Sequence, residues 1–244
     1  MEMKQKGHLH PITQVIREAI SIFDKLGFEV AEGPELETEW YSFDALNIPA
    51  DHPARDMQDT FWIKPNPKFE FKNYTKGKSE RAVLRPHTSP VQIRYMEKHN
   101  PPIRIISPGK VFRNEATDNK HEAQFFQLEC LYVDKEVSLS QLKGTIETYM
   151  KGMLGNDVEV RFRPSYFPFV EPALEVDVKF KGKWMEMMGA GMVHPNVLKA
   201  AGHDPKVWSG FAFGGGLERI FMVKSGLDDI RSLNNGDLRV ITQF

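Results

Sequence analysis

Hydrophobic and polar residues alternate through the segment Val111–Glu129, and this alternation predicts two strands joined by a short charged loop. Because successive side chains of a strand point to opposite faces, Arg113 and Glu115 share one face of the first strand. On the second strand, odd-numbered positions carry polar groups and one aromatic ring, whereas even-numbered positions carry side chains suited to a core. The odd-numbered set is Phe125, Gln127 and Glu129, and the even-numbered set is Phe126, Leu128, Cys130 and Tyr132.

The polar face of this hairpin allows two interpretations. It fits a nucleotide, because an arginine can bind phosphate through two donors, a carboxylate can accept from an exocyclic amine, and a ring can stack on a base. It also fits an ordinary half-exposed hairpin with paired charges. The hairpin alone does not distinguish a nucleotide site from an ordinary hairpin, so the evidence must come from the other segments.

Helical periodicity is clearest over Pro11–Leu26, where apolar residues recur at three-four spacing between an initial proline and Gly27. A second long helix is predicted over Ser138–Leu154. Shorter helices are predicted after the cap Ser89, which precedes a proline, and near Asn196–Ala201.

Short strands are predicted between these helices. They cover Phe28–Ala31, Thr60–Ile63, Arg81–Arg85, Val158–Phe162 and the hairpin Leu174–Phe180 with Trp184–Met188. Turns are predicted at Gly109 and in the glycine run Gly214–Gly216. Antiparallel strands dominate with helices between them, so the predicted class is α+β with a largely antiparallel sheet.

Two further segments carry candidate chemistry. Ser165–Pro172 packs two prolines and three aromatic rings into eight residues, which suits either a core plug or the wall of an apolar pocket. Arg219 lies in the first turn of a helix predicted over Leu217–Ser225. A cation there opposes the helix dipole, which indicates a specific anionic partner. The lysine-rich segment Lys64–Ser79 is predicted to be a solvated loop or a nucleic-acid contact.

Composition narrows the class of protein. The 244 residues are 41% hydrophobic and 27% charged, which is typical of a soluble globular protein. The net charge of −1 means that any nucleic-acid contact must be local. The single cysteine, Cys130, excludes an internal disulfide and a cysteine zinc site. The chain has no apolar run of about 18 residues and no signal-like start, so we expect a cytoplasmic protein without a membrane span.

Three segments occur in an order that resembles a known family. They are the helix and strand ending at Pro34, the Phe112-Arg113-x-Glu115 hairpin and the segment Gly214–Arg219, and they resemble motifs one, two and three of the class II aminoacyl-tRNA synthetases. The segments RPHTSPVQIR, PGKVFRNEATDNKHEAQFFQLE, SYFPFVEP, GAGMVHPNVL and SGFAFGGGLER resemble the α chain of bacterial phenylalanyl-tRNA synthetase. The resemblance implies one class II catalytic domain over residues 1–244, with an antiparallel sheet flanked by helices. We expect residues 1–8 to be flexible.

The resemblance also implies an activity and a set of ATP contacts. The activity is ATP-dependent conversion of L-phenylalanine to phenylalanyl-adenylate, followed by transfer to the 3′ end of tRNA(Phe), with Mg²⁺ as cofactor. Arg113 and Arg219 would bind phosphates and carry the catalysis. Glu115 would accept from the adenine amine, Phe125 would stack on adenine, and His121 would approach the phosphates.

A second set of residues is implied for the amino acid. His87, Ser89 and Gln92 would orient its amino and carboxylate groups, Gln127 and Glu129 would complete the polar end, Phe167 and Phe169 would clamp the ring edge-to-face, Ala212 would line the end of the pocket, and Trp62 would lie near the amino group. Glu171 resembles a magnesium ligand shared with a partner chain. An apolar pocket rejects an added hydroxyl only modestly, so the exclusion of tyrosine is expected to need editing elsewhere.

The expected partner chain and the differences from the family's sequence pattern leave alternative functions open. The partner would be a β chain, or a second copy through Pro11–Leu26 and Pro34. The family's N-terminal coiled-coil arm is lacking in this sequence, Pro86 stands where the family more often has threonine, and Lys64–Ser79 looks longer than usual. Activation of another aromatic amino acid, or a binding module without turnover, remain alternatives to the leading hypothesis.

Overall fold

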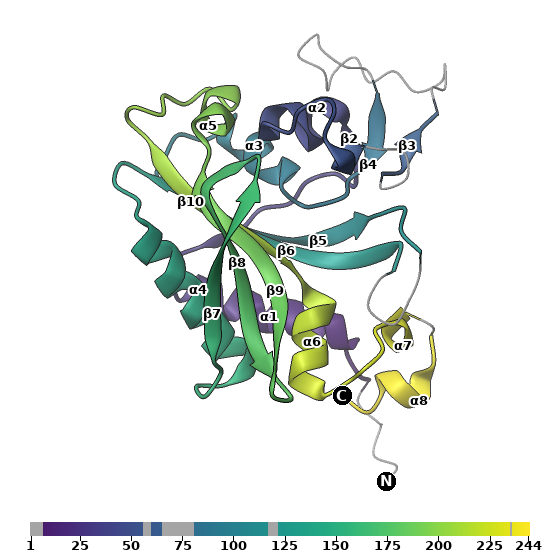
Figure 1. Cartoon of the computed structure of the whole chain (residues 1–244). Helices are drawn as coiled ribbons and strands as arrows, with labels where there is room; N and C mark the ends of the chain where they lie inside the picture. Colours follow the sequence, from purple (N-terminus) through teal and green to yellow (C-terminus); the bar gives the residue numbers. More distant parts are fainter. Residues whose placement is uncertain (1–6, 56–59, 65–80, 117–121, 235) are drawn as a thin grey trace.

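The larger of two β-sheets forms the centre of the structure, and the smaller sheet lies at its upper right edge in Figure 1. The structure is a computed structural model that describes residues 7–55, 60–64, 81–116, 122–234 and 236–244. The larger sheet has seven strands in the order β1-β5-β6-β10-β9-β8-β7 among the described residues. These strands are β1 (Glu29–Val30), β5 (Ile103–Phe112), β6 (Gln124–Asp134), β7 (Val160–Phe167), β8 (Val170–Phe180), β9 (Lys183–Val193) and β10 (Ser209–Gly216). The smaller sheet orders as β2 (Leu36–Thr38), β4 (Ala82–Leu84) and β3 (Trp62–Ile63).

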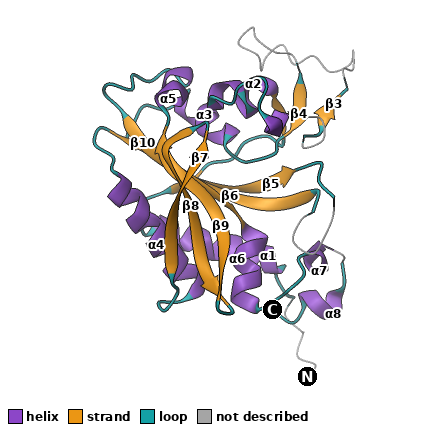
Figure 2. Cartoon of the chain, viewed as in Figure 1, coloured by secondary structure: helices purple, strands orange, loops and turns teal. Residues whose placement is uncertain are grey.

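Helices cover both faces of the larger sheet (Figure 2). One face packs against α1 (Pro11–Asp24), α4 (Leu139–Leu154) and α6 (Leu217–Ser225). The other face carries α2 (Glu39–Ser42), α3 (Pro90–Met96), α5 (Pro195–Ala200) and the 3-10 turns Asp44–Leu46 and Pro53–Arg55. The short helices α7 (Arg231–Asn234) and α8 (Leu238–Ile241) follow α6. Only the pair β1–β5 is parallel within the described strands, so the predicted α+β class with a largely antiparallel sheet is confirmed.

The alternation along β6 separates two hydrophobic cores. Its even-numbered residues Leu128 and Cys130 belong to the core under α1, α4 and α6, as predicted. Its odd-numbered residues Leu131 and Val133 belong to the second core, under α3 and α5. Since Glu129 and Gln127, the odd-numbered positions next to Leu131, are polar, the second core ends along β6 at Leu131.

The two long helices begin close to their predicted starts, at caps that were not predicted. The ring of His10 accepts from the Ile12 amide at 3.2 Å and begins α1 at Pro11. The helix ends at Asp24, two residues earlier than predicted, before Gly27 at φ +78°. Ser138 begins α4 with a reciprocal capping box that includes Gln141. Each cap joins residues that lie only a few positions apart.

The predicted glycine turns are wrong. Gly109 lies inside β5, and the run Gly214–Gly216 continues β10, paired with Gln127–Glu129 of β6. Glycine is needed there for space: a Cβ on Gly109 would collide with the Arg85 guanidinium, and one on Gly214 would lie 2.5 Å from Oε2 of Glu129. The first strand of the opening hairpin ends at Phe112, so Arg113 and Glu115 follow the strand, although the Arg113 amide still donates to the Ala123 carbonyl at 3.0 Å.

Several other boundaries shift by a few residues. Gly189-Ala190-Gly191 lies within β9, and β7 begins at Val160 and continues to Phe167. The part of the lysine-rich segment from residue 65 onward lies outside the described residues, as do residues 1–6. No helix in the described ranges is long and apolar enough to cross a membrane.

A buried ion pair joins α3 to the small sheet and generates a stability prediction. The Glu37 carboxylate on β2 is fully buried and accepts from Nε and Nη2 of Arg94 at 2.6 and 2.7 Å. Burial raises the pKa of Glu37, and the arginine partly opposes this. Replacing Arg94 with methionine leaves an unpaired buried carboxyl and should lower the free energy of unfolding by about 3 kcal/mol, measured by urea titration. The double variant Arg94→Met/Glu37→Gln should recover part of this loss, and a single-variant loss below about 1 kcal/mol would contradict the assignment.

Candidate active site

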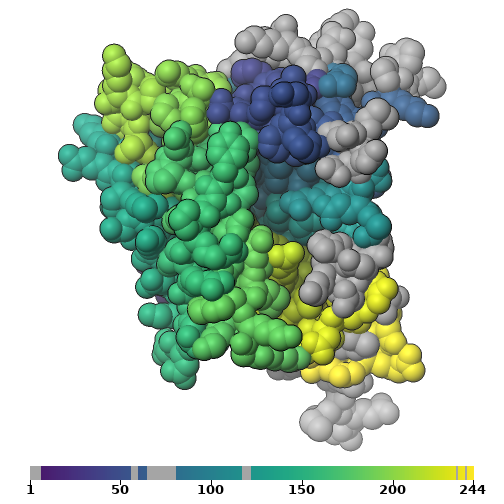
Figure 3. Space-filling view, viewed as in Figure 1, coloured from purple at the N-terminus to yellow at the C-terminus, as the bar shows by residue number. Residues whose placement is uncertain are grey.

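A cavity of about 550 Å³ opens on the odd-numbered side of β6, beyond the end of the second core. Its walls come from β6, β9, β10, the β7–β8 turn, the start of α6 and the segment before α3. On the face drawn in Figure 3, the blue residues near 40–55, the teal strands and the green strands β7–β9 lie close together. Segments distant in sequence therefore converge on one site.

Ten of the residues predicted to form the site line this cavity. They are His87, Ser89, Arg113, Glu115, Phe125, Gln127, Glu129, Phe167, Phe169 and Arg219. Gln92 lies directly behind the wall and donates to Glu129. His121 falls outside the described residues.

Glu129 is the buried acid at the centre of the site. Its Oε1 accepts from the Ser89 hydroxyl at 2.9 Å and from the Gln92 amide, and its Oε2 accepts from the Thr88 hydroxyl at 3.4 Å. Burial raises the pKa of Glu129 to about 7, and the three hydrogen bonds oppose that rise. Ser89 was predicted to cap α3, but its hydroxyl makes no capping bond and serves Glu129 instead.

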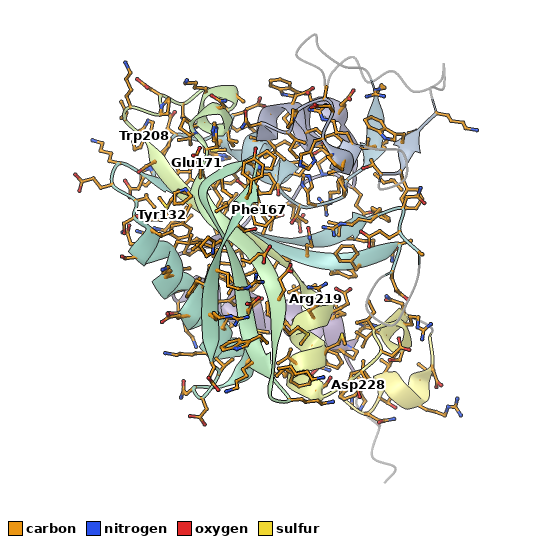
Figure 4. The ribbon with its side chains drawn as sticks, viewed as in Figure 1. Tyr132, Phe167, Glu171, Trp208, Arg219 and Asp228 are labelled. Carbon is orange, nitrogen blue, oxygen red and sulfur yellow. The ribbon has the colours of Figure 1, made fainter. Side chains whose placement is uncertain are left out.

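The nucleotide-like end of the cavity contains two arginines. The Arg113 guanidinium lies 5.0 Å from the Phe125 ring centroid, its Nη1 is 3.9 Å from Oε1 of Glu115, and its Nε donates to the Pro86 carbonyl at 3.1 Å. Arg219 lies at the start of α6 (Figure 4) and donates to the Glu186 carbonyl at 2.9 Å. Cationic groups therefore reach the cavity from two separate elements.

The apolar end is formed by the turn between β7 and β8. The rings of Phe167 and Phe169 lie nearly parallel, with centroids 5.8 Å apart. The Asn47 amide donates to the Pro168 carbonyl at 2.7 Å and holds the turn. A Cβ on Gly189 would approach the Phe167 ring to 2.9 Å, so glycine leaves space for that ring. Of the two predicted roles for Ser165–Pro172, the structure supports a pocket wall.

His87 is a neutral group between the two ends. Burial lowers its pKa to about 3, with a further contribution from the positive charge of Arg113. Its ring packs edge-on against Phe43, with ring centroids 6.4 Å apart, and the Phe43 and Trp62 ring centroids are 6.0 Å apart. Trp62 therefore lies behind Phe43 and is not among the described residues that line the cavity.

Two other predicted residues also lie outside the lining. Ala212 is buried in β10, paired between Gly191 and Leu131, and belongs to the second core. The Glu171 side chain is 78% exposed on β8, with His194 3.7 Å away (Figure 4). No group of three or more His, Cys, Asp or Glu side chains suited to a metal ion occurs within the described part of the chain.

Known proteins resemble this chain over its whole length. Residues 1–244 match the family of tRNA synthetases class II core domain (F). The phenylalanine–tRNA ligase alpha subunit of Synechocystis sp. is 52% identical, with 99% of this chain and 68% of that protein covered. The corresponding subunits of Acaryochloris marina and Thermosynechococcus vestitus are 51% and 50% identical, covering 98% and 99% of this chain, and 68% and 67% of their own lengths.

This chain belongs to the phenylalanine–tRNA ligase alpha subunit family of class II synthetases. The class II family in general uses ATP and Mg²⁺.

Sequence reasoning missed some lining residues of this synthetase core. The main ones are Glu122, Glu186, Met187, Met188 and Glu218, and Thr88, which donates to Glu129, was missed as well. Thr88 and Glu218 are direct neighbours of predicted residues, so adjacency was the available signal. Glu186 and the methionines reach the cavity through the pairing of β9 with β10, which no local pattern reveals.

The raised pKa values of the synthetase core predict a pH effect on stability. Burial raises the pKa of both Glu129 and Glu218 to about 7. Between the ordinary carboxyl pKa and pH 7, the folded chain then holds protons that the unfolded chain has released. Stability present at acidic pH is therefore lost as the pH rises toward 7, by up to about 3 kcal/mol for each group.

Urea unfolding of the wild type and Glu129→Gln between pH 5 and 7.5 measures this effect. The variant lacks one of the two titrating groups, so its stability should fall less steeply over this range. Parallel curves for the two proteins would show that Glu129 does not hold a proton in the fold.

Proposed function

We propose that this chain activates L-phenylalanine with ATP and transfers the phenylalanyl group to the 3′ end of tRNA(Phe). The observation that carries the proposal is the union, in one cavity, of two arginines, a stacking ring, a buried acid and an apolar aromatic end. The names of its relatives support the same reaction. In this proposal residues 1–244 form one catalytic domain that acts in the cytoplasm.

The nucleotide would occupy the arginine end. Arg113 would hold the α-phosphate and Arg219 the far phosphates, while adenine would stack on Phe125. Glu115, which is half-exposed and 3.9 Å from Arg113, would accept from the adenine amine. The contact of His121 with the phosphates rests on the family resemblance.

The amino acid would lie between this end and the aromatic turn. Its ring would meet Phe167 and Phe169, and Ala212, which belongs to the second core and not to the lining, would limit the depth of the pocket from behind. Its ammonium group would face Glu129, whose ionised form it favours, with Ser89, Gln92 and Gln127 nearby. A neutral His87 adds a polar ring without a competing positive charge. Trp62 would act through Phe43.

The reaction needs no protein nucleophile. A carboxylate oxygen of phenylalanine attacks the α-phosphorus of ATP, a new phosphorus–oxygen bond forms, and the bond to the pyrophosphate oxygen breaks. The protein would contribute by holding the two reactants in line and by placing positive charge beside the transferring phosphorus. Both arginines reach the same cavity, where they could neutralise the charge on the transferring phosphorus. This arrangement favours the catalytic hypothesis over a module that only binds.

Magnesium and partner chains complete the proposal. Carboxylates of Glu115, Glu122 and Glu186 line the cavity but form no metal cluster within the described residues, so one of them together with the phosphates would hold Mg²⁺, which would neutralise phosphate charge. The exposed Glu171 is retained as a ligand for a magnesium ion shared with a partner. That partner would be a β chain, or a second copy through α1 and Pro34.

Exchange of pyrophosphate into ATP tests this proposal. The chain, alone or with a β chain, should catalyse exchange that depends on L-phenylalanine, and Arg113→Ala should lower it by at least about 100-fold. Arg239→Ala is the matched control, because Arg239 is an exposed arginine paired with Asp237. The control should retain exchange. Absence of exchange in the wild type would refute the function, and full activity of Arg113→Ala would refute the phosphate role.

A further inference from the structure

Strand β10 ends before it reaches the first residues of its antiparallel neighbour β6. The last residue of β10, Gly216, pairs with Gln127, and the chain then enters α6. The next part of β6 toward the loop, Gln124–Phe126, has no β10 residue opposite it in the register of the described strands. The Glu218 side chain fills this place, because its Oε1 accepts from the Phe126 amide at 2.8 Å.

Glu218 is unusual for a carboxyl at a cavity wall. It is 3% exposed, and its second oxygen, Oε2, is buried without a hydrogen-bond partner among the described residues. Burial raises the pKa of Glu218 to about 7, while the hydrogen bond from Phe126 lowers it. A buried carboxyl with one unsatisfied oxygen costs stability, so a role beyond packing is indicated.

The Phe126 amide belongs to the peptide that joins Phe125 to Phe126. Phe126 packs against the first core, and Phe125 points the opposite way, into the cavity beneath Arg113. Phe125 is only partly buried, and in the register of the described strands it has no β10 residue opposite it. The orientation of its ring therefore depends on this peptide, which Glu218 holds from one side and β5 holds from the other.

We propose that Glu218 is a positioning residue that fixes the Phe125 ring as the stacking surface for the base of ATP. It acts through the Phe126 amide and does not contact the reacting atoms. This inference rests on the proposed function, because it assumes that the arginine end of the cavity binds the nucleotide.

The experiment compares Glu218→Ala with Glu218→Gln in the full chain. Alanine removes the acceptor, so Kd and KM for ATP should rise about tenfold, the usual size for a lost hydrogen bond to a buried group. The KM for L-phenylalanine should stay within about twofold, since the aromatic turn is untouched. Glutamine keeps an acceptor oxygen for the Phe126 amide and should restore ATP affinity.

A matched control separates positioning from general stability. Asp177 is a 1% exposed carboxyl on β8 that pairs with Arg161 and Arg163 and does not line the cavity. Asp177→Asn should reduce stability and leave the Kd for ATP unchanged. Equal losses of affinity for both substrates in Glu218→Ala, or no rescue by glutamine, would overturn the inference.

Hydrogen exchange distinguishes this inference from the function on which it rests. The Phe126 amide should exchange slowly in the wild type and in Glu218→Gln, and quickly in Glu218→Ala. If the wild type fails to bind ATP or to catalyse the exchange of pyrophosphate into ATP, the proposed function fails. If the wild type binds ATP, and Glu218→Ala changes neither the affinity for ATP nor the hydrogen exchange of the Phe126 amide, only the positioning role fails.

Discussion

The burial of the Glu129 carboxyl at the middle of the sheet is the constraint on which the site depends. Removing a carboxyl from water costs several kcal/mol unless hydrogen bonds replace the solvent. Ser89, Gln92 and Thr88 provide those bonds, and all three belong to α3 or the segment before it. The same interaction therefore satisfies the acid, attaches α3 to the sheet and positions the polar wall of the cavity.

Other features follow from this buried acid. Its neighbour on β10 must be Gly214, because any side chain there would collide with the carboxyl. The second core cannot include Glu129. Along β6 its odd-numbered members therefore begin at Leu131, two residues after Glu129. The cavity lies in the space that this change leaves. With a pKa of about 7, the acid can change charge when a cationic group approaches, at little cost near neutral pH.

The parts of this arrangement that the sequence predicted are local or periodic. The parity of β6, the apolar spacing of α1 and α4, and the aromatic segment at Phe167 and Phe169 could each be recognised from local spacing. The family resemblance then selected the polar residues that share the cavity. In physical terms, short-range spacing determines which face a side chain occupies.

The missed parts depend on contacts between distant segments. The glycine run Gly214–Gly216 was predicted as a turn because glycine is common in turns, but here it makes space for Glu129 and for β9. The hydrogen bond from Phe126 to Glu218 spans 92 positions and could not be predicted from either segment alone. Trp62 and Glu171 were assigned by resemblance, and their distance from the cavity follows from packing around Phe43 and from the exposed side of β8.

The central claim is that one cavity holds an aromatic amino acid beside the α-phosphate of ATP. A crystal structure with a non-hydrolysable phenylalanyl-adenylate analogue tests it most directly. The account predicts the phenyl ring against Phe167 and Phe169, the ammonium group within hydrogen-bond distance of Glu129 or Gln127, and adenine on Phe125. A well-ordered analogue bound elsewhere, or one with its two ends reversed in this cavity, would contradict it.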